Sequence, residues 1–264
     1  MTRPPENQAA PPTVLPVRVV EPARPLRWLA AGWHDCVRTP GPSLLHGLLV
    51  ALGGMVVLSL AWGRAYVLAG AFSGFVLVGP ILATGLYELS RLLGRGERPT
   101  LANVVDAWRR GTPPLVVLGL LLMFAATMWV AVSAALFALV LPGGIDGPRA
   151  LLAYAARPES DLPLLVWLLF GGLGAAIVFA MTAISPPLLM GRQVGLRCAL
   201  LTSVRAVGEN PVPMLIWALF IIVATVVSIA TLMLGFIVAV PVLGHATWHA
   251  YRDLVDTSAA ALRY

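Results

Sequence analysis

The longest stretch without a charged residue runs from Asn210 to Tyr251. A membrane-spanning helix needs about 20 apolar residues. This stretch is too long for one span, and we predict two spans that divide near Leu234 and Gly235 with a very tight turn. Hydrophobic residues form 59% of the chain and charged residues only 11%. A soluble domain with that balance would expose large apolar patches, so the sequence predicts a polytopic membrane protein.

Four further uncharged runs precede this stretch. They cover Thr39 to Gly63, Ala65 to Tyr87, Pro113 to Ile145, and Leu162 to Gly191. Each is long enough to cross a bilayer once, because a helix rises 1.5 Å per residue and the hydrocarbon core is about 30 Å thick. Together with the C-terminal pair, they predict an all-α bundle of six transmembrane helices.

Three short segments between these runs have the pattern of amphipathic helices. In Leu26 to Arg38, apolar side chains recur at helical spacing, with arginine and histidine on the opposite side. The pattern returns after Thr100, which can cap a helix, and again from Leu196. Such helices lie along a membrane surface, with tryptophan at headgroup depth and arginine near the phosphates. The side chains that we expect to contact headgroups or a docking partner are Arg27, Arg38, Arg109, Arg110, Arg197, Arg205, Trp28, Trp33 and Trp108.

One amphipathic helix followed by two spans occurs three times, in units of about 26–95, 100–191 and 196–256. Gly74 to Arg91 and Gly235 to Arg252 also resemble each other, since both open on Gly-Phe and place a proline six residues after the glycine. The pattern predicts a pseudo-threefold bundle. We expect the membrane domain to cover 26–256, after a disordered proline-rich tail at 1–25 and before a short C-terminal tail at 257–264.

Arginine counts predict the orientation. All eighteen basic residues are arginines, and fifteen of them lie in the N-terminal tail, the loops after the second and fourth spans, and the C-terminal tail. The positive-inside rule therefore places both termini and all three amphipathic helices in the cytoplasm. In so hydrophobic a chain, the formal net charge of +6 favours contact with anionic lipid headgroups over nucleic acid.

Three separated motifs carry a family resemblance. They are RPLRWLAAGWHDCVRTPGPSLLHG, GFVLVGPILATGLYELSRLLGRGERPT and PVLGHATWHAYRDLV. Together they resemble an uncharacterised family of bacterial integral membrane proteins known as domain of unknown function 2189, over roughly Val17 to Val255. The resemblance implies a multi-pass protein of the bacterial inner (cytoplasmic) membrane, and it implies no activity, cofactor or catalytic residue. Some members of the family carry a label that links them to cytochrome c oxidase.

The histidines are the candidate metal or haem ligands. His245 and His249 are four residues apart and share one helix face. His46 and His34 are expected at the same membrane boundary, so all four converge if the units close into a ring. Two histidines without a thiolate or paired carboxylates lack the ligands of a specific site, and no CxxCH motif is present. We predict no cofactor, with haem or a transition metal as the alternative and hydrogen-bonded interfacial side chains as the simpler interpretation.

The prolines at matching places in the return spans are the candidate kinks. Pro80, Pro187 and Pro241 would each free a backbone carbonyl four residues earlier. Broken helices with free carbonyls at the bilayer midplane build the substrate sites of many transporters. A proline kink is also an ordinary packing device, because nearby hydroxyl groups can satisfy the backbone.

The sequence leaves three functions open. No phosphate loop, nucleophile elbow or HExxH motif is present, so we expect a protein that is not an enzyme and assign no catalytic residue. The first hypothesis is a noncatalytic membrane-organising or assembly protein, whose partners are anionic lipid and a membrane complex or a second copy of the chain. The second is a transporter of small solutes or lipid that uses the kinked spans. The third is an accessory protein of a respiratory oxidase.

Overall fold

The computed structural model describes residues 13–61, 82–140, 153–154, 156–157, 161–258 and 260–263. Within these ranges the fold is all-α, and its only β pairing consists of two isolated bridges. Residues 82–93 are also helical. The labelled helices are α1 (Arg24–Arg38), α2 (Pro40–Ala61), α4 (Leu101–Arg109), α5 (Pro113–Val140), α7 (Asp161–Thr182), α8 (Ser185–Gly191), α9 (Leu196–Glu209), α10 (Pro211–Ala230) and α11 (Phe236–Leu254).

The predicted helix starts are confirmed at the amphipathic segments and at their prolines. Helices α2, α5 and α10 each begin on a proline, which fits a first turn because the backbone N–H groups there have no partner within the helix. Helix α4 begins with a capping box, in which the backbone N–H of Thr100 donates to Asn103 Oδ1 at 2.8 Å. Prolines and caps therefore mark where the chain changes direction.

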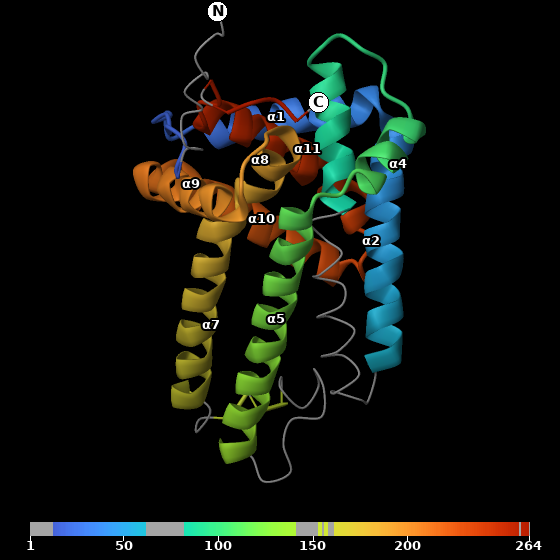
Figure 1. Cartoon of the computed structure of the whole chain (residues 1–264). Helices are drawn as coiled ribbons and strands as arrows, with labels where there is room; N and C mark the ends of the chain where they lie inside the picture. Colours follow the sequence, from blue (N-terminus) through green and yellow to red (C-terminus); the bar gives the residue numbers. More distant parts are fainter. Residues whose placement is uncertain are drawn as a thin grey trace, which may run out of the picture.

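The helices form two regions (Figure 1). The axes of α2, α5 and α7 are roughly parallel, and α1, α4, α8, α9 and the C-terminal part of α11 gather at one end of them. We call this gathering, with α11 counted from residue 245, the helical layer. The three predicted amphipathic segments, α1, α4 and α9, all belong to it.

Four described segments are long and apolar enough to cross a membrane. They are Pro40–Ser59, Pro113–Leu136, Leu164–Gly191 and Pro211–Ala230. The predicted second span falls mostly within residues 62–81, together with Pro80, and so lies outside the described residues. Helix α11, predicted as the sixth span, is not among the four, because its C-terminal half carries two histidines, Arg252 and Asp253. The predicted division of the last apolar stretch is confirmed, since α10 ends at Ala230 and α11 begins at Phe236.

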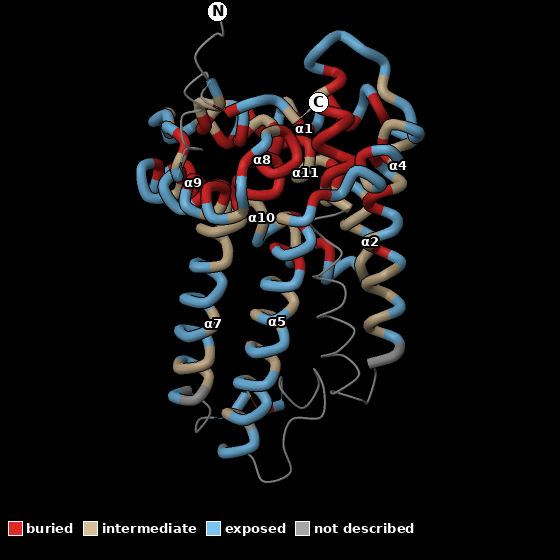
Figure 2. The backbone as a smooth tube through the Cα atoms, in the orientation of Figure 1, coloured by how far each residue is buried: buried red, intermediate tan, exposed pale blue. Residues whose placement is uncertain are grey.

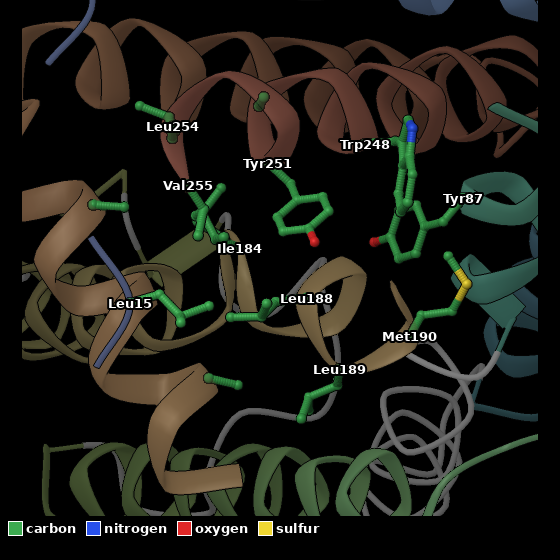
Figure 3. Close-up of a cluster of buried hydrophobic side chains, with 14 of the residues drawn as sticks. Leu15, Tyr87, Ile184, Leu188, Leu189, Met190, Trp248, Tyr251, Leu254 and Val255 are labelled. Carbon is green, nitrogen blue, oxygen red and sulfur yellow. The ribbon is translucent and has the colours of Figure 1, made fainter. Parts of the chain in front are cut away.

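Most buried side chains lie in the helical layer and not between the spans (Figure 2). In Figure 3, Tyr251 of α11 faces Leu188 of α8, and Trp248 of α11 lies against Tyr87 near Met190. By contrast, none of the residues from Leu164 to Thr182 in α7 is buried within the protein. This distribution suits a bilayer, where lipid-facing apolar side chains need no protein cover because acyl chains surround them.

Both ends of the described chain pack against the helical layer and form hydrogen bonds there. Leu15 is fully buried in the core cluster, and its backbone N–H donates to Thr202 Oγ1 at 3.0 Å. Val17 pairs with Val255 in an antiparallel bridge. The prediction of a disordered tail at 1–25 is therefore wrong from Leu15 onward, where buried side-chain and backbone contacts hold the segment in place.

Candidate functional site

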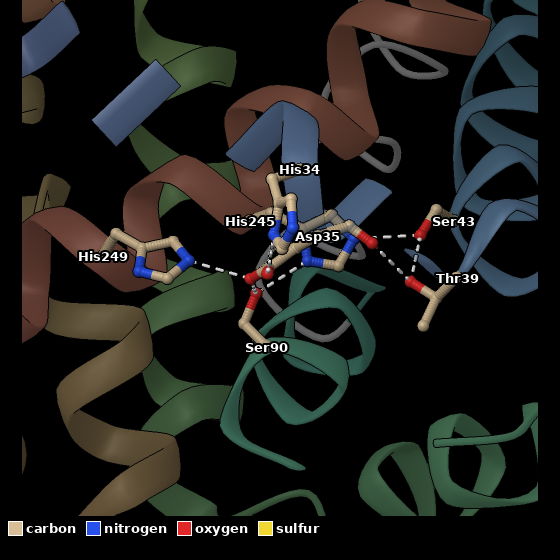
Figure 4. Close-up of polar contacts among 7 residues, drawn as sticks. All are labelled: His34, Asp35, Thr39, Ser43, Ser90, His245 and His249. Atoms are coloured by element: carbon tan, nitrogen blue, oxygen red, sulfur yellow. Dashed lines mark hydrogen bonds and ion pairs between the residues drawn. The ribbon is translucent and has the colours of Figure 1, made fainter. Parts of the chain in front are cut away.

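A buried cluster of polar side chains joins four parts of the chain (Figure 4). We call it the polar cluster and define it as Asp35, Thr39, Ser43, Ser90, His245 and His249. Asp35 comes from α1, Ser43 from α2, Ser90 from the helix at 82–93, and both histidines from α11. Thr39 lies between α1 and α2.

Asp35 is the acceptor at the centre of the polar cluster. Ser90 Oγ and His249 Nε2 both donate to Asp35 Oδ2, each at 2.8 Å. Burial would raise the pKa of Asp35, but the hydrogen bonds from His249 and Ser90 outweigh burial and lower that pKa. The group is therefore a carboxylate at neutral pH.

His245 lies between two serine hydroxyl groups. Its Nδ1 is 2.7 Å from Ser90 Oγ, and its Nε2 is 2.9 Å from Ser43 Oγ. Because the single hydroxyl hydrogen of Ser90 is donated to Asp35, Ser90 accepts from His245 Nδ1–H. In the neutral imidazole, Nε2 is then the acceptor and Ser43 is its donor.

This chain of carboxylate, hydroxyl, imidazole and hydroxyl groups resembles a nucleophile with its base in connectivity. Ser43 and His245 are, however, both 0% exposed. Thr39 closes the arrangement, because its hydroxyl donates to the carbonyl oxygen of Asp35 at 3.0 Å and lies 2.9 Å from Ser43 Oγ. In this structure, then, the polar cluster connects helices, and its Ser43 and His245 are not exposed to a substrate.

The structure brings three of the four predicted histidines to one carboxylate. His249 contacts Asp35 directly, His245 is linked to it through Ser90, and His34 Nδ1 lies 3.9 Å from Asp35 Oδ1. His46 makes none of these contacts, because its Nδ1 is 2.7 Å from the carbonyl oxygen of Pro42 and its ring packs against Trp108. Among the residues that the structure describes, no group of three or more histidine, cysteine or carboxylate side chains has the arrangement of a metal site. Haem or metal ligation stays a prediction from the sequence.

A second buried carboxylate, that of Glu88, holds the end of α4 against the helix at 82–93. Glu88 is 2% exposed and accepts two hydrogen bonds from Arg91, at 2.6 and 2.7 Å. Arg110, which we expected at lipid headgroups, pairs with the same carboxylate at 3.1 Å. Trp108 also faces inward, since its Nε1 donates to the carbonyl oxygen of Leu82 at 3.1 Å. These two residues therefore attach α4 to the helix at 82–93.

Trp28 and Trp33, both predicted at headgroup depth, have different environments. Trp28 is 1% exposed, donates from Nε1 to Asp253 Oδ2 at 2.7 Å, and packs edge-on against Trp217. The prediction is wrong for Trp28, because Asp253 occupies its N–H and the protein encloses its ring. Trp33 is 55% exposed on the outer side of α1.

The outer faces of the three amphipathic helices expose arginine beside apolar side chains. Arg38 on α1, Arg109 on α4 and Arg197 on α9 are exposed. Among the described residues, no carboxylate lies within 4.0 Å of any of the three. Arg27 and Arg205, also predicted to bind headgroups, lie 4.0 and 2.6 Å from Glu21 and Glu209. The exposed apolar side chains on these faces include Leu26, Trp33, Val37, Leu101, Leu201 and Val204.

The two described prolines of the predicted kinks have different surroundings. Pro187 is buried in α8, which begins after a break at residues 183–184. Pro241 lies inside α11, and the carbonyl that it frees, on Ile237, packs against Gly47 so closely that a Cβ there would overlap it. A cavity of about 670 Å³ lies between α5 and α7, where Trp129 and Trp167 stack, and neither proline lines it.

A comparison with protein families supports the membrane assignment. Residues 67–191 match the family DUF2189, described as a predicted integral membrane protein. The match confirms the family seen in the sequence motifs and covers a shorter part of the chain than the expected Val17 to Val255. No curated protein and no solved structure matches the chain. The DUF2189 match therefore identifies an integral membrane protein, and its description names no activity.

Proposed function

We propose that this protein is a noncatalytic membrane-organising or assembly protein whose helical layer binds anionic lipid headgroups and presents a docking surface. One observation carries the proposal. Each of α1, α4 and α9 buries one side in the protein and exposes an arginine with no described carboxylate partner on the other, beside exposed apolar side chains. A helix at a membrane surface needs this combination, because its apolar side enters the acyl boundary while its cations meet the phosphates.

The expected energy is modest and additive. An arginine near an anionic membrane surface contributes about 1 kcal/mol, so Arg38, Arg109 and Arg197 together contribute about 3 kcal/mol. Arg27 and Arg205 contribute less, because each already has a carboxylate neighbour. The arginine-rich side faces the cytoplasm in this proposal, with both termini there and the protein in the bacterial inner membrane.

The predicted threefold repeat of one amphipathic helix and two apolar helices is part of the same proposal. Each unit places an amphipathic helix before its apolar helices, so three units put three lipid-binding helices on one face of the membrane. That face is the surface we propose for a membrane complex or a second copy of the chain. Transport through kinked spans and a histidine metal or haem site stay predictions from the sequence, and the cavity between α5 and α7 includes none of their residues.

The test compares two triple variants with the same change in charge. The first is Arg38→Gln, Arg109→Gln and Arg197→Gln, and the matched control is Arg18→Gln, Arg27→Gln and Arg205→Gln, whose arginines all have a carboxylate within 4.0 Å. Both proteins are reconstituted in nanodiscs of mixed phosphatidylglycerol and phosphatidylcholine, and the lipid retained per chain is measured by native mass spectrometry.

We expect the first variant to lose phosphatidylglycerol enrichment by a factor of ten or more, since 1.4 kcal/mol corresponds to about tenfold in binding. The control should lose markedly less. An equal loss in both would mean that only net charge matters, and unchanged enrichment in the first would remove the proposal.

A further inference from the structure

We infer that α10 and the first part of α11 form a re-entrant hairpin, which enters and leaves the bilayer at the helical layer and turns among the acyl chains. Its partner is the acyl-chain region of the leaflet next to the layer. The inference concerns the last two of the six predicted spans, which would not cross the membrane. It rests on four observations: the length of α11, the depth of its turn, the hydrogen bonds of that turn and the composition of the turn.

The part of α11 that lies outside the helical layer is too short to cross the bilayer. His245 lies at the level of the layer, because its ring nitrogens meet Ser43 in the first turn of α2 and Ser90, which donates to Asp35 of α1. Beyond it, α11 also contacts the layer through His249 and Asp253. Only residues 236–244 remain to enter the bilayer. At 1.5 Å per residue they span about 13 Å, less than half of the roughly 30 Å hydrocarbon core.

The turn between the two helices lies at an intermediate depth. A Cβ on Gly54 would lie 3.3 Å from the sulfur of Met233, which places the turn beside Gly54 of α2. Helix α2 continues to Ala61, about 10 Å farther along its axis. Figure 1 agrees, since α2, α5 and α7 all extend farther from the layer than the orange and red hairpin.

The backbone N–H groups of the turn are all paired within the protein. Every N–H from Thr231 to Ala239 donates to an acceptor within the hairpin, at 2.8–3.2 Å. The N–H of Gly235 is the most informative, because its acceptor is the side-chain oxygen of Thr231 at 3.0 Å. Inside hydrocarbon an unpaired backbone group costs several kcal/mol, so pairing of every N–H group favours a turn at that depth.

The side chains of the turn are those of a lipid environment. Leu232 and Leu234 are 70% and 57% exposed, and no charged residue lies between Asn210 and Arg252. Leu232 and Met233 both adopt positive φ, of 51° and 71°, where turns in water usually place glycine, asparagine or aspartate. An exposed leucine at this position fits acyl chains better than water.

Cysteine labelling in sealed membranes tests the inference. In a background with Cys36→Ala and Cys198→Ala, single cysteines replace Leu234 in the turn, Gly208 in the layer and Leu162 at the start of α7. All three are exposed positions, and a Cβ on Gly208 meets nothing within 4 Å. Leu232→Cys is a second turn position in case Leu234→Cys does not fold. A membrane-impermeant maleimide is added to right-side-out and to inverted vesicles.

We expect Gly208→Cys to react from one side only, Leu162→Cys from the other only, and both turn cysteines from neither side until detergent is added. A nitroxide at Leu234 should also collide far more with oxygen than with a water-soluble nickel chelate. Labelling of the turn from the Leu162 side would show a complete crossing, and labelling from the Gly208 side would show a turn outside the bilayer. Either result overturns the inference. The pattern is independent of whether the layer arginines bind anionic lipid, so the two proposals fail separately.

Discussion

Asp35 connects three helices at one end of the protein. It accepts hydrogen bonds from His249 and from Ser90, and its backbone carbonyl accepts from Thr39. These contacts connect α1 with α11 and with the helix at 82–93. A buried carboxylate with such partners is costly to remove, because each donor then loses its acceptor away from water.

The variant Asp35→Ala should therefore lower the free energy of unfolding by about 1–3 kcal/mol. Asp106→Ala is the matched control, because Asp106 is exposed on α4 and loses no buried partner. Thermal unfolding in detergent, followed by circular dichroism, measures both. Equal melting temperatures for the two variants would contradict a stabilising role for the polar cluster.

Asp253 makes the stability of the folded protein depend on pH in the acidic range. Burial would raise its pKa, but hydrogen bonds from Arg24 and Trp28 outweigh burial, so its pKa is lowered in the folded protein. A lowered pKa means that the stabilisation is present above the unfolded pKa, near 4, and is lost as pH falls through the folded value.

Melting temperatures are measured from about pH 7 down to about pH 3. In the wild type, the melting temperature should decrease once the pH is lower than about 4. Asp253→Asn should already be less stable at pH 7 and should show a shallower decline in acid. An unchanged acid slope in this variant would show that other carboxylates account for the whole effect.

At the scale of helices, α11 is held by close approach of backbones. A Cβ on Gly32 of α1 or on Gly47 of α2 would overlap backbone atoms of α11. Small residues let apolar helices approach in this way, and side-chain packing then supplies the attraction. By contrast, a Cβ on Gly172 of α7 would meet nothing within 4 Å, because that face is open.

These two glycines form a matched pair for mutation. Gly47→Ala should lower the free energy of unfolding by about 1–3 kcal/mol, because α2 and α11 must move apart to admit a methyl group. Gly172→Ala should be neutral or slightly stabilising, since alanine is the better helix former. Resistance to detergent unfolding compares them, and a destabilised Gly172→Ala beside a stable Gly47→Ala would refute the packing argument.

At the scale of the whole molecule, the two ends of the chain close the layer together. The backbone N–H of Arg18 donates to the carbonyl oxygen of Leu254 at 2.8 Å, and that of Asp256 to Pro16 at 2.9 Å. The buried Leu15 then inserts into the same core as α8, α9 and α11. Segments more than 200 residues apart in the sequence thus form one side of the layer.

We expect Leu15→Ala to cost about 2–5 kcal/mol of stability, because it opens a cavity in a closely packed core. Val19→Ala, in the same segment but 76% exposed, should change stability by less than about 0.5 kcal/mol. Unfolding in detergent measures both. If the two variants unfold alike, the N-terminal segment is not part of the cooperative fold.

The local sequence pattern was sufficient to predict where the helices begin. The polar cluster could not be predicted in this way, because it depends on contacts between residues far apart in the sequence. Uncharged runs, prolines and the Thr100 cap predicted the starts of α2, α4, α5 and α10, because these signals act within a few residues along the chain. Asp35 went unnoticed, since a single acid on an amphipathic helix is ordinary until its partners are known. Those partners, Ser90 and His249, are 55 and 214 residues away.

The arginines and tryptophans that were all predicted to contact lipid headgroups also differ through long-range contacts. Sequence alone predicted an arginine-rich, apolar membrane protein with three amphipathic helices, because charge and hydropathy follow from residue identity. It did not show that Trp28 is buried against Asp253 and Arg110 pairs with the buried Glu88, while Trp33 and Arg109 are exposed and pair with neither carboxylate. Tertiary packing made that choice, because the buried carboxylates Asp253 and Glu88 need donors in a low dielectric, and those two side chains supply them.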